Sequence, residues 1–190
     1  MRPFCRSRLP QMELRPPDPP LGDDRVVLRH WTDTDVPAIV AACRDPDTAR
    51  WTTVPMPYTE RDARDWIERC ANAWERGIAP FAVVERESGE LAAAISMWLN
   101  GSAAELGYWA VPGQRGKGFV PRAVRLVTRW CLDDLGLARV QLGTFPGNEA
   151  SERVAEKCGF TREGVLRAWA EQRGDRRDMT MWSVLPGELV

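Results

Sequence analysis

A strand that runs into a glycine-rich loop and then into an amphipathic helix is the feature of this sequence that most restricts its fold. The segment reads E-L-G-Y-W-A-V-P-G-Q-R-G-K-G-F-V-P-R-A-V over residues 105–124. Apolar residues recur at helical spacing from Val120 to Leu135. The first N–H groups of a helix lack intrahelical acceptors and carry partial positive charge, and glycines let loop amides converge on one anion. We therefore expect an anion site here that fits a phosphate or a pyrophosphate.

Two common phosphate-binding motifs do not fit this loop. A Walker A loop needs Ser or Thr after its lysine, but Gly118 follows Lys117. A dinucleotide fingerprint needs a third glycine where Pro121 stands. The loop taken alone is also compatible with a pair of glycines that only caps a helix.

The order of the expected elements predicts the fold class. We expect helices at 32–43, 59–74, 120–135 and 148–158, and strands at 25–29, 81–86, 91–99, 105–111, 139–145, 160–169 and 177–185. Three consecutive strands form a meander, and the chain shows neither strict β-α-β alternation nor a bundle. This order predicts an α+β (mixed α/β) domain with a central mixed, mostly antiparallel sheet flanked by about four helices.

Length and composition limit the class of protein. The 190 residues correspond to about one domain, which we place at 23–190, after a flexible Pro- and Arg-rich tail at 1–22. With 26 basic and 27 acidic residues, the net charge of −1 excludes a globally basic nucleic-acid binder. The apolar stretches fall far short of the roughly 20 residues that a membrane span needs. Five cysteines without a C-x-x-C pair and one histidine argue against a metal site and indicate a reducing, cytoplasmic compartment.

A second segment, N-E-A-S-E-R-V-A-E-K-C-G-F at 148–160, has the features of a well-capped helix. Asn148 is a strong N-cap residue, and two glutamates in the first turn favour the positive helix end. Ser151 lies one turn into the helix, on the same face as Ala155. On its own this segment indicates no more than a helix.

Together the two segments resemble the GNAT superfamily of acyl-CoA N-acyltransferases. The sequence R-G-K-G-F-V at 115–120 looks like the family's R/Q-x-x-G-x-G/A loop, and 148–160 looks like the helix that follows it. E-L-G-Y-W at 105–109 and D-M-T-M-W-S-V-L at 178–185 look most like the RimJ/RimL branch, which acetylates ribosomal-protein N-termini and various small amines. The resemblance covers about 25–186. It implies a splayed sheet, acetyl-CoA (coenzyme A) as co-substrate and no metal.

The resemblance also implies a set of cofactor contacts. The pyrophosphate would lie on backbone N–H groups of the loop, and the pantetheine arm would pair with the end of the preceding strand, where two strands separate. Asn148 would hydrogen-bond this arm. The cofactor-binding residues implied in this way are Trp109, Ala110, Val111, Arg115, Gly116, Lys117, Gly118, Phe119, Val120 and Asn148.

Three residues depart from the family pattern. Val120 stands where the loop normally ends in Gly or Ala, and Pro121 has no N–H to donate. We therefore expect cofactor binding to be weakened but not abolished. Ala155 occupies the position of a general-acid tyrosine that many members carry, and Ser151 is the replacement that we favour.

Direct acetyl transfer needs a neutral amine, a polarised thioester carbonyl and a stabilised leaving thiolate. Glu105 is the candidate base, because alternation along the strand places it on one face with Trp109, where partial burial would make its carboxylate a better proton acceptor. The N–H of Val111 is the candidate polariser of the carbonyl, and Ser151 is the candidate acid. A solvated strand-start carboxylate and an ordinary helix serine are the plain alternatives for Glu105 and Ser151.

The acceptor site is expected in the proline-rich loop at 51–59, the place where this family shapes it. Trp51, Met56 and Tyr58 are the candidate substrate contacts, and a packed loop is the alternative. The acceptor would be a primary amine, either the N-terminal α-amine of a protein or peptide or a small-molecule amine, acetylated through a ternary complex.

Two other functions remain compatible with the sequence. One is an acetyltransferase that modifies an amine antibiotic. The other is a non-catalytic acyl-CoA-binding sensor, which the three departures from the family pattern favour. Neither a nucleic acid nor a membrane is expected as a partner, and a homodimer is left open.

Overall fold

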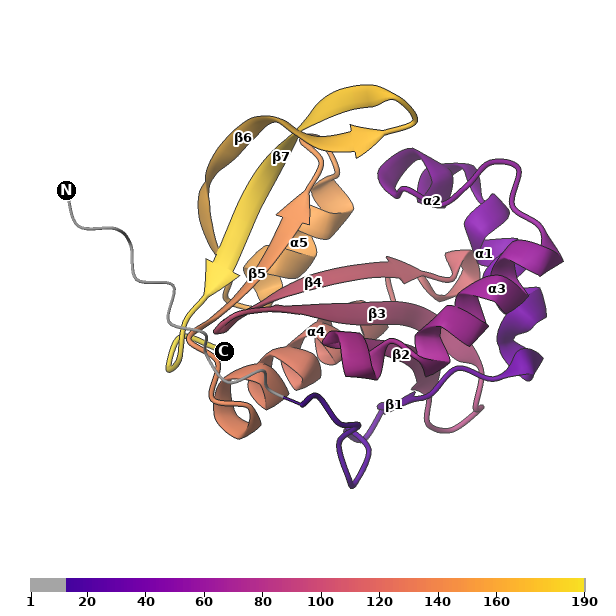
Figure 1. Cartoon of the computed structure of the whole chain (residues 1–190), viewed down its shortest axis with the longest axis horizontal. Helices are drawn as coiled ribbons and strands as arrows, with labels where there is room; N and C mark the ends of the chain where they lie inside the picture. The colour runs from indigo at the N-terminus through magenta and orange to yellow at the C-terminus, as the bar shows by residue number, and fades with distance from the viewer. Residues whose placement is uncertain (1–12, 190) are drawn as a thin grey trace.

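A seven-stranded sheet, with the strand order β1-β2-β3-β4-β5-β7-β6, forms the centre of the protein in a computed structural model that describes residues 13–189. Neighbouring strands are antiparallel except for β4 and β5, which are parallel. The expected mixed, mostly antiparallel sheet is therefore confirmed (Figure 1). The strands are Val26–Arg29 (β1), Ile78–Glu85 (β2), Leu91–Asn100 (β3), Ala103–Ala110 (β4), Arg139–Thr144 (β5), Thr161–Gln172 (β6) and Asp175–Val184 (β7).

Five α-helices accompany this sheet within residues 13–189, one more than the sequence predicted. They are Val36–Arg44 (α1), Pro46–Trp51 (α2), Glu60–Ala71 (α3), Phe119–Arg129 (α4) and Glu149–Lys157 (α5). The additional helix is α2, which has six residues and is too short to show a periodic apolar pattern. A π-helical turn at Trp130–Asp134 continues α4. None of the helices described here has the length and apolarity needed to cross a bilayer.

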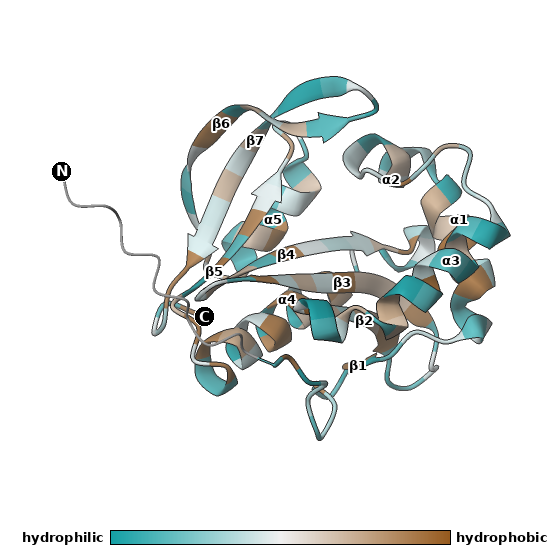
Figure 2. Ribbon diagram, viewed as in Figure 1, coloured by the Kyte–Doolittle hydropathy of each residue, from teal (hydrophilic) through white to brown (hydrophobic). Residues whose placement is uncertain are grey.

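Alternating residues of the central strands contribute side chains to two apolar clusters, one on each face of the sheet. Phe81 and Ile95 belong to the cluster beneath α4, which supplies the fully buried Phe119 and Val124. Apolar colouring is concentrated where α4 meets β2 and β3 (Figure 2). Residues such as Ala82 point to the opposite face, where α1 and α3 cover them.

The parallel strands β4 and β5 separate halfway along their length. Their paired residues run from Ala103 and Arg139 to Leu106 and Leu142. β4 then continues to Ala110 without β5 beside it. The splayed sheet that the family resemblance implied is therefore confirmed.

The expected tail at 1–22 lies partly outside the described residues, which begin at 13. Within the remainder, Leu14 is only 4% exposed and belongs to the α4-side cluster. Gly22 also forms a β-bridge with Val27. Leu14 and Gly22 thus contact the domain, whereas most residues between them are exposed, and the domain boundary at residue 23 stays a prediction.

Candidate active site

A cavity of about 900 Å³ opens where β4 and β5 separate. The N-terminal ends of α4 and α5 line one part of it, which we call the cofactor side. Residues of α2, α3 and the loop after α2 line the other part, the acceptor side. The end of β4, including Trp109 and Ala110, lies between them. The structure therefore brings most of the sequence-predicted residues to one cavity.

The glycine-rich loop reaches α4 through two residues in left-handed conformation. Gly116 has φ of 78° and Gly118, the N-cap of α4, has φ of 85°. A Cβ on either residue would meet nothing within 4 Å. No side chain of the described chain caps α4, so the first N–H groups of this helix can donate hydrogen bonds to an anion. Phe119 and Val120 also line the cavity, as expected.

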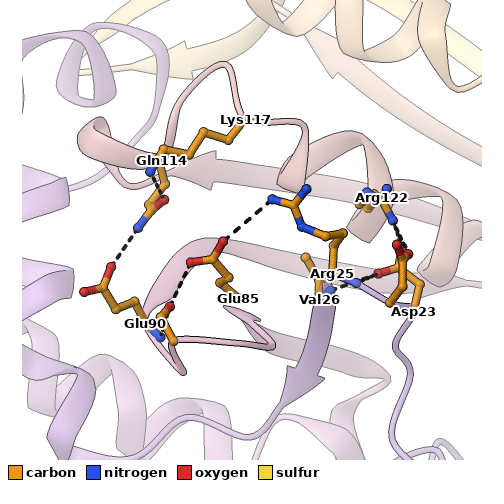
Figure 3. A network of polar contacts seen from close by, with 10 residues as sticks. Asp23, Arg25, Val26, Glu85, Glu90, Gln114, Lys117 and Arg122 are labelled. Carbon is orange, nitrogen blue, oxygen red and sulfur yellow. Dashed lines mark hydrogen bonds and ion pairs between the residues drawn. The ribbon is translucent and has the colours of Figure 1, made fainter.

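The two cations of the loop are held by side chains of the protein. Lys117 does not line the cavity. Its Nζ donates to Gln114 Oε1 at 2.8 Å, and Gln114 Nε2 donates to Glu90 Oε2 at 3.1 Å (Figure 3). Arg115 lines the cavity, but its guanidinium is bound to residues at the start of α2. The expected direct contact between Lys117 and the cofactor is therefore not supported, because Gln114 and Glu90 hold this side chain against the turn between β2 and β3.

The expected role of Val111 is wrong. Its N–H donates to the carbonyl of Ala92 in β3 at 2.9 Å, so it cannot polarise a thioester. Because N–H groups alternate in direction along an antiparallel strand, those of Tyr108 and Ala110 point to the side that β5 has left. These two amides are the better candidates for contact with the cofactor.

A tyrosine that the sequence analysis missed lies beside Ser151. The hydroxyl oxygens of Tyr108 and Ser151 are 2.8 Å apart, and both residues line the cofactor side. Burial raises the pKa of Tyr108 above its ordinary value, although the hydrogen bond from Ser151 opposes this shift, so the phenol stays protonated at neutral pH. Strand alternation could have found this residue, because it points Tyr108 to the face opposite Glu105.

Asn148 has its carbonyl oxygen occupied at the start of α5. Oδ1 accepts the N–H of Ser151 at 3.2 Å and thereby caps the helix. Asn148 lines the cavity, and its side-chain nitrogen, Nδ2, is the donor that it can offer to a ligand.

The acceptor side is rich in aromatic residues. Trp51 and Tyr58 line it, as predicted, and Tyr58 is only 5% exposed. Trp66 and Trp109 line it too, and both pack on Trp31, with ring centroids 4.6 and 6.2 Å away respectively. The buried Trp31 thus connects the two lining tryptophans, one from α3 and one from the end of β4.

Trp98 extends this aromatic surface across the neighbouring strand. It is 42% exposed and lies directly over Gly107, where a Cβ would come within 2.9 Å of the indole ring. The glycine of the E-L-G-Y-W segment is therefore needed for close approach of this ring. Met56, by contrast, is 54% exposed and does not line the cavity. Its expected substrate contact is not supported, since its side chain faces solvent.

Glu105 lies outside the cavity lining. It is exposed, it faces Trp98 across the β3–β4 pair, and its carboxylate accepts a hydrogen bond from Gln141 Nε2 at 3.3 Å. The partial burial that the sequence analysis expected is therefore absent. Its role as a base stays a prediction, based on its place on the same strand face as Gly107 and Trp109.

Comparison with known proteins identifies the class to which this site belongs. Residues 25–161 match the family described as an acetyltransferase (GNAT) domain, so the chain belongs to the GNAT family of acetyltransferases. The uncharacterized N-acetyltransferase YoaA of Bacillus subtilis (strain 168) is 31% identical over 172 residues, which are 88% of this chain and 97% of YoaA.

Among the solved structures that share the fold are two complexes with coenzyme A derivatives. Mycobacterium smegmatis RimJ in complex with CoA-disulfide has a TM-score of 0.76 at 20% identity, with 86% of this chain and 83% of RimJ covered. The microcin C7 self immunity acetyltransferase MccE, in complex with acetyl-CoA and AMP, also has a TM-score of 0.76 at 20% identity, with 86% of this chain and 93% of MccE covered.

Proposed function

We propose that this enzyme transfers the acetyl group of acetyl-CoA directly to a primary amine within a ternary complex. The observation that carries the proposal is that one cavity contains both the uncapped N-terminus of α4 and the end of β4 that β5 has left. A diphosphate and a thioester arm attached to it would thus be held next to an aromatic acceptor pocket. The complexes of RimJ with CoA-disulfide and of MccE with acetyl-CoA support this choice of cofactor.

Backbone amides would bind most of the cofactor. Those of Gly116, Gly118 and Phe119 would donate to the diphosphate, whereas Pro121 has no N–H to contribute. The N–H groups of Tyr108 and Ala110 would contact the arm and polarise the thioester carbonyl. The cofactor itself supplies the activated acyl group.

Proton movement at the leaving sulfur would depend on the pair formed by Tyr108 and Ser151. The phenol of Tyr108 is protonated at neutral pH and lies 2.8 Å from Ser151 Oγ, so either hydroxyl could donate to the sulfur while the other orients it. For the amine, a weak base is sufficient when the acceptor is an α-amine, whose pKa of about 8 leaves part of it neutral at pH 7. Glu105, acting directly or through water, is the base that we propose.

The acceptor that we favour is an N-terminal α-amine of a peptide or protein with an apolar side chain. Aromatic residues dominate the acceptor side, and Arg115 forms ion pairs with Asp45 and Asp47 at the start of α2, which leaves a net charge of only −1 there. A polycation would lack the acidic cleft that it needs. The fold likeness to RimJ supports this class, and the likeness to the self immunity enzyme MccE supports a small amine toxin or antibiotic as the alternative.

An acceptor screen tests the function. The purified chain is mixed with acetyl-CoA and a panel of peptides, small amines and aminoglycosides, and products are read by mass shift and thiol release. We expect acetyl-CoA to raise the melting temperature and at least one amine to release thiol. Glu105→Gln should slow thiol release while the thermal shift remains, and Glu87→Gln, which removes an exposed glutamate of the β2–β3 turn, is the matched control. A thermal shift without thiol release from any amine would favour the sensor alternative.

The state of the cysteines supports a proposal for the cellular compartment. Cys43, Cys70, Cys131 and Cys158 are buried and free in the structure, which is compatible with a reducing environment. We therefore propose a cytoplasmic location.

A further inference from the structure

The short helix α2 forms part of the acceptor side and is attached to the protein at both of its ends. Its N-cap is Asp45, whose Oδ1 accepts the N–H of Thr48 at 3.0 Å. Thr48 and Trp51 line the cavity. A helix of six residues is not stable by its own backbone bonds, so the position of this wall depends on what holds its ends.

The C-terminal end of α2 is held by the hairpin of β6 and β7 (Figure 1). Gln172, which is only 7% exposed, donates from Nε2 to the carbonyls of Arg50 and Thr52 at 3.0 and 2.7 Å. At the tip of the hairpin, Arg173 donates to the carbonyl of Ala49 at 2.5 Å. This end is therefore fixed by contacts that do not involve the glycine-rich loop.

The N-terminal end of α2 is held by Arg115 of the glycine-rich loop. The guanidinium donates to Asp45 Oδ1, to the hydroxyl of the buried Thr48 at 2.9 Å and to Asp47 Oδ2 at 3.5 Å. Burial pulls the pKa of Asp45 upwards, but the hydrogen bonds from Arg115 and from the Thr48 N–H lower it below the ordinary value. The carboxylate is thus held ionised opposite the guanidinium.

We propose that Arg115 is a positioning residue that links the cofactor loop to the acceptor wall, and that it is not a ligand of the diphosphate. If its guanidinium turned to a phosphate, Asp45, Asp47 and the hydroxyl of the buried Thr48 would each lose a charged donor. Arg115 immediately precedes Gly116 and Lys117 in the glycine-rich loop, and its side chain is bound to the start of α2. A ligand that orders the loop therefore also orders α2. Because coupling between two sites is reciprocal, an ordered α2 in turn favours cofactor binding. This inference rests on the proposed function, since it assumes that the loop binds coenzyme A.

The affinity for coenzyme A, measured by calorimetry, shows whether Arg115 links the loop to α2 or binds the diphosphate directly. Asp45→Asn is the decisive variant, because asparagine is an equally good N-cap and removes only the charge. A link predicts that Arg115→Gln and Asp45→Asn each weaken binding by about threefold to fivefold, as expected for a partly exposed charge pair, and that the double variant is no weaker than the single ones. A ligand predicts a loss of tenfold or more for Arg115→Gln and unchanged or tighter binding for Asp45→Asn. That second pattern would overturn the proposal.

Amide hydrogen exchange at 47–51 provides a readout that a purely structural ion pair would not change. Adding coenzyme A should slow exchange in α2 of the wild type, and this effect should disappear in Arg115→Gln and in Asp45→Asn although coenzyme A still binds. Arg61→Gln, which removes an exposed arginine of α3 that forms an ion pair with Asp65, is the control and should behave as the wild type. If coenzyme A did not change the amide exchange rate in α2 of the wild type, the proposed coupling between the loop and α2 would be refuted. A wild type that does not bind coenzyme A at all would refute the proposed function itself.

Discussion

Gly118 and Gly89 offer a matched pair of substitutions that separates backbone strain from cofactor binding. Both have positive φ, 85° and 71° respectively, and a Cβ on either would meet nothing within 4 Å. The cost of alanine at each position is therefore backbone strain alone, about 1–2 kcal/mol. For a chain of this size, each kcal/mol lowers the melting temperature by roughly 2–4 °C. We expect both variants to melt lower than the wild type by similar amounts.

Only Gly118 lines the cavity, where it is the N-cap of α4. Its new methyl group would stand at the surface that the anion must approach. A hydrogen bond to a charged group contributes about 1.5–3 kcal/mol, so the loss of one such bond weakens binding by about 10- to 150-fold, at 1.4 kcal/mol for each factor of ten. Gly89, in the turn between β2 and β3, should leave the affinity for coenzyme A unchanged.

The assay is calorimetric titration of each variant with coenzyme A, together with thermal melts in its absence. The reasoning would be refuted if Gly118→Ala bound coenzyme A as tightly as Gly89→Ala does. Equal affinities at the wild-type level would mean that the anion does not approach Gly118, and equal affinities below that level would mean that strain spreading through the fold explains the loss.

Three further predictions address other parts of the protein. Gly107→Ala should push the ring of Trp98, which lies 2.9 Å from the position that the new methyl group would take, and raise the KM for the acceptor severalfold in steady-state assays, while calorimetry shows unchanged affinity for coenzyme A. Hydrogen bonds from Arg139 and, to a smaller extent, from Ser183 lower the pKa of Glu163 from 4.5 to about 2. This carboxylate therefore stabilises the fold above pH 4.5 and loses that contribution as the pH falls towards 2. Urea unfolding of Glu163→Gln should therefore show a weaker dependence on pH in this window than the wild type. Met56→Ala should leave the KM of the acceptor unchanged, and a clear increase would return this residue to the acceptor side.

The parts of the site that the sequence could predict are those set by local chemistry. Asn148 caps α5 because its side chain reaches an amide three residues away. Gly118 begins α4 because a left-handed residue is needed there. Alternation along β4 also places Glu105 on one strand face with Gly107 and Trp109, since this depends only on the period of a strand.

The parts that the sequence could not predict depend on tertiary contacts. The direction of the Val111 N–H follows from the register of β4 on β3. The exposure of Glu105 depends on which helix covers that end of the sheet. The helix α2 has a local start signal, an Asp45 cap followed by Pro46, but six residues are too few to form a stable helix alone. It depends on its contacts with Arg115 and Gln172, which lie far from it in the chain.

The separation of β4 from β5 explains why a cofactor and an acceptor can meet in this fold. Side chains that alternate along β4 reach opposite faces of the sheet, with Tyr108 directed to α5 and Gly107 lying beneath Trp98. A continuous sheet would keep these faces apart. Beyond Leu106, however, β4 has no strand on the side opposite β3 among residues 13–189, and the amides that point to this side need a partner. A thioester arm that pairs with these amides lies in the gap itself, open to the leaving-group hydroxyls on one face and to the amine on the other. Substitutions on the face of Tyr108 should therefore alter the kinetics of acetyl-CoA, and those on the face of Gly107 should alter the kinetics of the amine. A change that closes the gap should abolish the reaction of both substrates.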